Sequence, residues 1–155
     1  MTRIATAAAV VSLGLLSSCG DEPNQLSGSL SEVYDLEFDE VQAMLMGSAT
    51  DGFLVVEYLR DEGKAIKLSV NLEGLTITPG EKFSLTELVG GIPRGTMQQI
   101  ADRTRDFPMD TGTLALDQPL TPGASLAGHF RTVLAEPKGY SLNGDFSAVL
   151  EAIDL

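Results

Sequence analysis

The chain contains one histidine, His129, and its surroundings in the sequence include possible catalytic partners. Histidine has the unperturbed side-chain pKa closest to neutrality, so it can exchange protons at physiological pH. Asp145 occupies a comparable place in a second, similar segment, with Ser141 and Ser147 nearby. Serine, histidine and aspartate are the groups of a hydrolase triad. The sequence shows no nucleophile turn, however, and a flat strand face is a poor cavity, so it favours a solvated His129–Asp145 pair.

A second candidate is the tripeptide Asp110-Thr111-Gly112, which resembles the motif of aspartic proteases. That chemistry needs the aspartate in a tight loop after an apolar strand, where two carboxylates can share a proton. The preceding stretch here is charged and contains Pro108, and Thr113 replaces the small residue that is usual after the motif. The sequence therefore favours a plain loop leading into the apolar stretch "GTLALD".

Metal-binding side chains are scarce. One histidine and one cysteine argue against zinc or copper. Carboxylates, which calcium prefers, are frequent between residues 32 and 40. Their alternation with apolar residues is typical of the solvated face of a strand, and no EF-hand spacing is present. The sequence predicts neither a metal site nor a cofactor. The carboxylates concerned are Glu32, Asp35, Glu37, Asp39 and Glu40.

The N-terminus has the features of an export signal. Arg3 is followed by an uncharged apolar run over residues 4–16 and then by small residues, a pattern typical of a secretory signal peptide. The run Leu16-Ser17-Ser18-Cys19 resembles the lipobox of bacterial lipoproteins. That resemblance implies a signal peptide over residues 1–18, cleavage before Cys19 and a diacylglycerol on its sulfur. The mature protein is then expected to attach to a membrane through this lipid.

Residues 19–29 are polar and lack apolar periodicity, so they are expected to form a flexible tether. In Gram-negative lipoproteins, aspartate directly after the lipidated cysteine favours retention in the inner membrane. Here Gly20 holds that place and Asp21 follows it. By this resemblance the expected location is the cell envelope, with the outer membrane favoured over the inner membrane.

The mature chain of 137 residues is long enough to bury a core, and residues 30–155 are expected to form one domain. Nine basic and 22 acidic side chains remain after loss of Arg3, giving a formal side-chain charge of −13. A negative field of this size repels phosphate, which argues against nucleic acid as a partner. A protein of the cell envelope is still possible as a binding partner.

Extended segments dominate the remaining chain, because apolar and polar residues alternate with a period of two. The segments 53–60 and 65–72 are predicted to pair around Gly63. Residues 96–103 are predicted to form a short helix or an irregular crossover. The fold class predicted is an all-β antiparallel sandwich or barrel of about eight strands. The other expected strands cover residues 30–38 with a continuation over 41–45, then 75–77, 83–85, 112–117, 125–134 and 141–150.

Two stretches near the C-terminus, "GASLAGHFRTVL" and "GYSLNGDFSAVL", repeat one pattern sixteen residues apart. Their alternation predicts two paired strands, with Gly139 in the connecting turn. A four-residue turn would place Phe130 opposite Phe146. Gly128 and Gly144 would then make room for bulky neighbours or permit strand curvature.

No motif in the mature chain specifies a reaction. The sequence favours a non-enzymatic, lipid-anchored envelope protein that serves as a structural or protein-binding module. Two alternatives are a β-barrel that carries a small apolar ligand and a hydrolase that uses His129 and Asp145.

Overall fold

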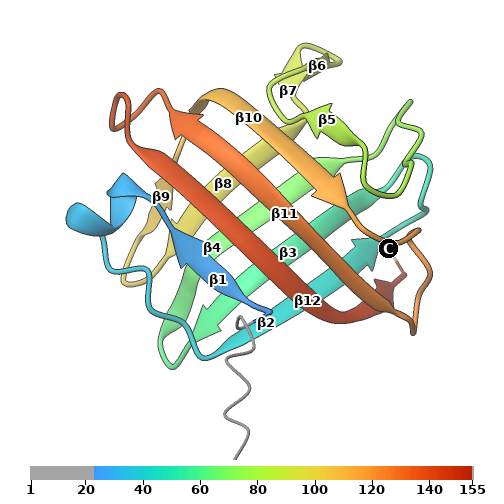
Figure 1. Cartoon of the computed structure of the whole chain (residues 1–155), viewed down its shortest axis with the longest axis horizontal. Helices are drawn as coiled ribbons and strands as arrows, with labels where there is room; N and C mark the ends of the chain where they lie inside the picture. Colours follow the sequence, from blue (N-terminus) through green and yellow to red (C-terminus); the bar gives the residue numbers. More distant parts are fainter. Residues whose placement is uncertain (1–22, 155) are drawn as a thin grey trace, which may run out of the picture.

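The computed structural model describes residues 23–154, and nearly all of their regular structure is β (Figure 1). The expected signal peptide and Cys19 lie outside these residues. The strands are β1 (Gln25–Ser27), β2 (Glu40–Met46), β3 (Phe53–Arg60), β4 (Gly63–Asn71), β5 (Lys82–Ser84), β6 (Leu88–Val89), β7 (Ile92–Pro93), β8 (Gly95–Ile100), β9 (Thr104–Asp106), β10 (Met109–Leu116), β11 (Ser125–Leu134) and β12 (Ser141–Ile153), and a 3-10 helix, η1, spans Ser29–Glu32.

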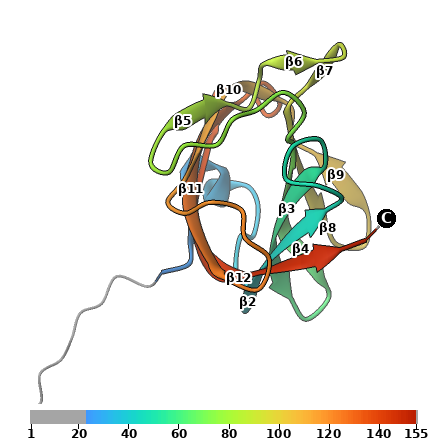
Figure 2. The same ribbon diagram turned by 90° about the vertical axis from the view of Figure 1, so that its right-hand side faces the viewer.

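Ten of these strands form one mixed sheet in the order β5-β10-β11-β12-β2-β3-β4-β8-β9, with β1 joined to β12. The sheet folds over so that its two halves face each other across the core (Figure 2). The long β12 belongs to both halves: it pairs antiparallel with β11 and β1, and its last residues pair parallel with β2. The expected all-β class is confirmed. The expectation of a purely antiparallel sheet and the barrel alternative are wrong, because β12 and β2 run parallel and the sheet does not close. The sandwich of about eight strands is not confirmed, since ten strands belong to one sheet.

The β3–β4 hairpin is confirmed, with Glu57 opposite Lys67 and a positive φ at Gly63. From Ile66 to Val70, every second residue of β4 is fully buried. These side chains join a cluster contributed by both halves of the sheet. Burial of this apolar face holds the hairpin against the core.

The repeated stretches do pair as β11 and β12, but their register differs by two residues from the prediction. Phe130 lies opposite Gly144 and Phe146 opposite Gly128. The connection is longer than a four-residue turn, since Leu134 N–H donates to the Tyr140 carbonyl at 2.8 Å. A shift of two keeps every side chain on its predicted face. Each phenylalanine ring therefore lies over the glycine of the other strand.

Four segments were predicted wrongly. Residues 30–38 are not a strand: η1 buries Leu30, and irregular chain follows until β2. Residues 75–77 form no strand. Residues 96–103 form no helix, because most of them belong to β8, which lies between β4 and β9 and buries Met97 on alternate-residue spacing. Residues 25–27, which the sequence placed in the tether, form β1.

Candidate functional site

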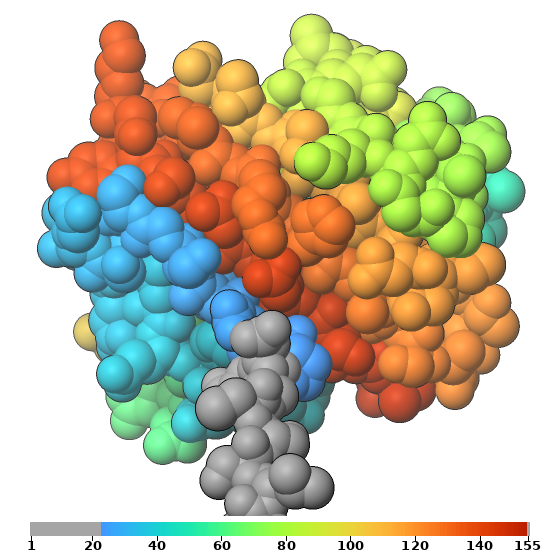
Figure 3. All heavy atoms as spheres, in the orientation of Figure 1, coloured from blue at the N-terminus to red at the C-terminus, as the bar shows by residue number. Residues whose placement is uncertain are grey.

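The described structure has a groove of about 1040 Å³ near the start of β1. Residues 23–26 line one side of it, and residues 34–40 line the other. In the space-filling view the blue and cyan atoms of this N-terminal segment lie beside the red atoms of β12 (Figure 3). The groove exists because β12 pairs with β1 along its first half and with β2 along its last residues, which leaves space between those two partners.

The irregular side of the groove is held firmly by contacts with the other half of the sheet. Arg60 Nη1 donates to Asp35 Oδ2 at 3.0 Å, and Gln99 Nε2 donates to the Asp35 carbonyl at 3.1 Å. The ring of Tyr34 packs against Phe107, with 5.2 Å between centroids. These contacts fix the backbone of residues 34 and 35 before any ligand binds.

The floor of the groove is apolar and continuous with the core. Phe38 packs edge-on against Tyr58, with ring centroids 4.9 Å apart, and Leu36 is buried. Leu26 of β1 is half-buried and also packs against the core. A ligand in the groove would therefore meet apolar side chains as well as polar ones.

The β1 side offers an unpaired strand edge. The backbone N–H and C=O groups of the even-numbered residues of β12 point toward β11: the Leu150 N–H, for example, donates to the Ala124 carbonyl at 2.9 Å. The odd-numbered residues of β12 consequently face β1, where Asp145 pairs with Gln25. Leu26 lies opposite Gly144, so its N–H and C=O point away from β12 and toward the groove.

A second, smaller depression of about 570 Å³ adjoins the groove and shares part of its lining. Asp61 and Glu62 of the β3–β4 turn, together with Asp102, line its far side. Among residues 23–154, the only ion pair made by a lining carboxylate joins Asp35 to Arg60. The joined depressions are therefore strongly acidic.

The structure places His129 directly opposite Asp145, whereas the sequence predicted only that Asp145 lies within reach of His129 on the same face. The Asp145 carboxylate is nevertheless engaged by Arg131, whose Nη2 donates to it at 2.9 Å. Ser141 hydrogen-bonds Ser29 through its hydroxyl. Within the described chain no hydrogen bond joins a serine to the imidazole, so the groups of the hydrolase hypothesis are only partly brought together.

Beneath this pair lies a buried tyrosine that sequence reasoning missed. Tyr58 donates its hydroxyl hydrogen to the Asp145 carbonyl at 2.8 Å. Burial raises the pKa of this hydroxyl well above its usual range; the Asp145 charge raises it further, and Arg131 acts in the opposite direction. A neutral phenol so placed fixes β3 to β12 across the core.

The protease-like tripeptide lies at a bulge of strand β10, between Met109 and Thr111. Asp110 is exposed, and Gly112 is buried in the strand. The prediction of a loop here is wrong, since pairing with β11 begins at Met109. An exposed strand aspartate does not resemble the tight loop that carboxylate pairing requires.

The acidic run also differs from its prediction, because Glu32 lies in η1 and Asp35, Glu37 and Asp39 lie on irregular chain. In the described residues no three of the His, Cys, Asp and Glu side chains are arranged to hold a metal ion. No helix of residues 23–154 has the length and apolarity needed to cross a bilayer.

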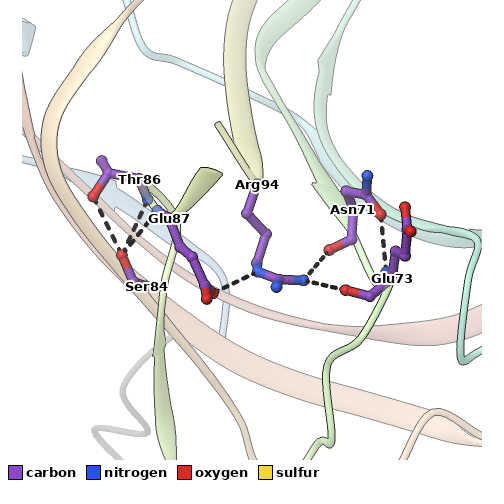
Figure 4. A network of polar contacts seen from close by, with 6 residues as sticks. All are labelled: Asn71, Glu73, Ser84, Thr86, Glu87 and Arg94. Atoms are coloured by element: carbon purple, nitrogen blue, oxygen red, sulfur yellow. Dashed lines mark hydrogen bonds and ion pairs between the residues drawn. The ribbon is translucent and has the colours of Figure 1, made fainter. Parts of the chain in front are cut away.

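A second polar feature lies at the other end of the sheet (Figure 4). Arg94 is buried and donates to Glu87 Oε2 at 3.1 Å, and to the carbonyls of Asn71 and Glu73 at 2.8 and 3.1 Å. It fixes the base of the β6–β7 hairpin. Its partners are distant in sequence, so no local pattern predicts it.

Comparisons with known proteins add nothing to this description: no family model, no curated protein and no solved structure matches the chain.

Proposed function

We propose that this chain is a lipid-anchored protein of the bacterial cell envelope that binds another protein and catalyses no reaction. The binding site is the groove between β1 and residues 34–40. An extended segment of the partner lies there as an additional strand beside β1. The observation that carries the proposal is the unpaired edge at Leu26, facing a groove whose opposite side is already fixed.

Strand addition suits this geometry because main-chain hydrogen bonds supply affinity and flanking side chains supply specificity. A preorganised rim lowers the conformational cost of binding. Arg60 and Gln99 hold Asp35 in place in this way, so little of this side of the groove has to become ordered on binding.

The packing of the interior argues against the carrier alternative. Tyr58 and Phe130 are fully buried and contact each other edge-on, with centroids 6.3 Å apart. Phe146 is 1% exposed. These rings fill the space between the two halves of the sheet, where an apolar ligand would have to lie.

The anchor is proposed to be the lipid on Cys19, which precedes the first described residue, Pro23, by four positions. Such a short connection would keep the groove close to the outer membrane. Cys19→Ser should leave an unprocessed precursor without radiolabelled fatty acid. Processing or labelling of that variant would contradict the anchor and leave the groove unaffected.

The binding site can be tested by photocrosslinking in intact cells. A benzoylphenylalanine is placed at Gln25, an exposed position on the groove, and in a control chain at Glu81, an exposed loop position. The proposal expects a discrete protein adduct from position 25 and none from position 81, with the crosslinked peptide identified by mass spectrometry. Equal adducts from both positions, or none from position 25, would refute it.

A further inference from the structure

The groove combines an apolar floor with an excess of negative charge that the described chain does not neutralise. Among residues 23–154, Arg60 is the only cation lining either depression, and it is already bound to Asp35. The lining carboxylates without an ion pair in the described chain are Glu37, Asp39, Glu40, Asp61, Glu62 and Asp102.

Crowded carboxylates repel one another, and this repulsion disfavours the folded state. Away from the groove, Glu57 is bound by Lys64 and Asp145 by Arg131, whereas other described carboxylates such as Glu81 have no ion pair but do not line this depression. A cationic ligand would relieve the repulsion around the groove.

We propose that the segment received by the groove is basic, an extended peptide with lysine or arginine at alternate positions. This inference rests on the proposed function and specifies its partner class. The peptide's backbone pairs with Leu26, and its cationic side chains reach the carboxylates of the opposite side. Alternate side chains of a strand point to one face and lie about 7 Å apart. Glu37 and Asp39 are likewise two residues apart, and both are exposed.

Backbone chemistry separates a peptide from simpler cations. The Leu26 edge presents both an N–H donor and a C=O acceptor. A second peptide strand satisfies both groups, whereas a polyamine offers only donors and a metal ion neither donates nor accepts hydrogen bonds. The described carboxylates also form no metal-holding group of three.

Binding is measured by fluorescence anisotropy with the processed, lipidated chain in neutral detergent. The probes are three labelled ten-residue peptides: alternating Lys-Thr, alternating Glu-Thr and alternating Lys-Pro. The Lys-Thr peptide should bind, with affinity that falls as salt is raised. The Glu-Thr peptide should not bind. The Lys-Pro peptide has the same charge, but half of its residues lack an N–H and proline disfavours a paired strand conformation, so its affinity should be roughly tenfold lower.

A matched pair of variants separates the site from the general negative field. One carries E37Q, D39N and E40Q at the groove. The other carries E73Q, E81Q and D117N at exposed positions elsewhere, so both lose the same net charge.

The groove variant should bind the Lys-Thr peptide roughly tenfold more weakly, and the control should change by less than about twofold. Equal losses in the two variants, or equal binding of the Lys-Pro peptide, would overturn the inference. So would full displacement of the peptide by equimolar spermine or calcium. A crosslink from Gln25 to a neutral or acidic segment would overturn the basic partner while leaving the groove as a protein-binding site.

Discussion

Gly144→Ala should destabilise the protein through a steric conflict with the facing strand. A β-carbon at this position would lie 2.2 Å from Phe130 Cε1 and 2.7 Å from the Tyr58 hydroxyl oxygen. Gly144 does not have a positive φ, so alanine adds no backbone strain there. Forcing a ring out of a packed core typically costs 1–3 kcal/mol, and we expect about 2 kcal/mol for this change.

The assay is urea unfolding followed by circular dichroism, on the chain from residue 19 with Cys19→Ser. Phe130→Leu shortens the side chain that meets the new methyl group. Alone, Phe130→Leu should lower the free energy of unfolding by about 1–2 kcal/mol. The double variant should lose about 1 kcal/mol less than the sum of the two single losses.

Gly123→Ala provides a contrast, because Gly123 has a φ of 81° and no atom within 4 Å of the added carbon. Its cost is conformational and should be unaffected by Phe130→Leu. If Gly144→Ala costs less than about 0.5 kcal/mol, or if its cost simply adds to that of Phe130→Leu, the explanation of the repeated pattern by facing glycine and phenylalanine is refuted.

Three further substitutions test two buried polar groups, Tyr58 and Arg94, by urea unfolding. Burial raises the pKa of Tyr58 far above 10. Above pH 10 the unfolded state therefore ionises while the folded state keeps its proton. The free energy of unfolding is unaffected by ionisation of this group below pH 10 and falls by about 1.4 kcal/mol per pH unit above it. Tyr58→Phe should cost about 1 kcal/mol at pH 7, and its deficit should shrink between pH 10 and 11; a constant deficit would contradict the assignment. Arg94→Lys should lower the free energy of unfolding by about 1–3 kcal/mol, because lysine cannot reproduce the forked contacts. Glu87→Gln, which changes an exposed partner, should lower it by less than about 1 kcal/mol. Equal losses in the two variants would instead show that the ion pair dominates the network.

Sequence periodicity predicted the strands whose inner residues are apolar throughout. The hairpin of β3 and β4 and the pairing of β11 with β12 follow from alternation alone, because burying one face of a strand leaves little freedom in which side points inward. The same rule failed at residues 30–38, where Leu30 and Leu36 are buried although the backbone is not a strand. It also failed at β8, because a short apolar spacing in a Gly-rich and Pro-rich stretch fits both a helix and a strand.

The candidate site was only partly predictable. The sequence showed an excess of carboxylates near residues 32–40, yet it assigned them to the solvated face of a strand. Their role at the groove depends on where Arg60 and Gln99 bind Asp35, and on the unpaired side of β1, which are contacts between distant parts of the chain. The lipobox-like Cys19 remains an expectation from sequence.

The sequence by itself determined the all-β class and the faces of the long strands, because period-two alternation is a local property that burial then enforces. Only the tertiary structure decided the sheet order, the parallel pairing of β12 with β2, the two-residue shift between the repeated strands and the groove beside β1. Those features depend on which distant segments share hydrogen bonds and how Phe130 fits over Gly144, and long-range packing of that kind leaves no periodic signal along the chain.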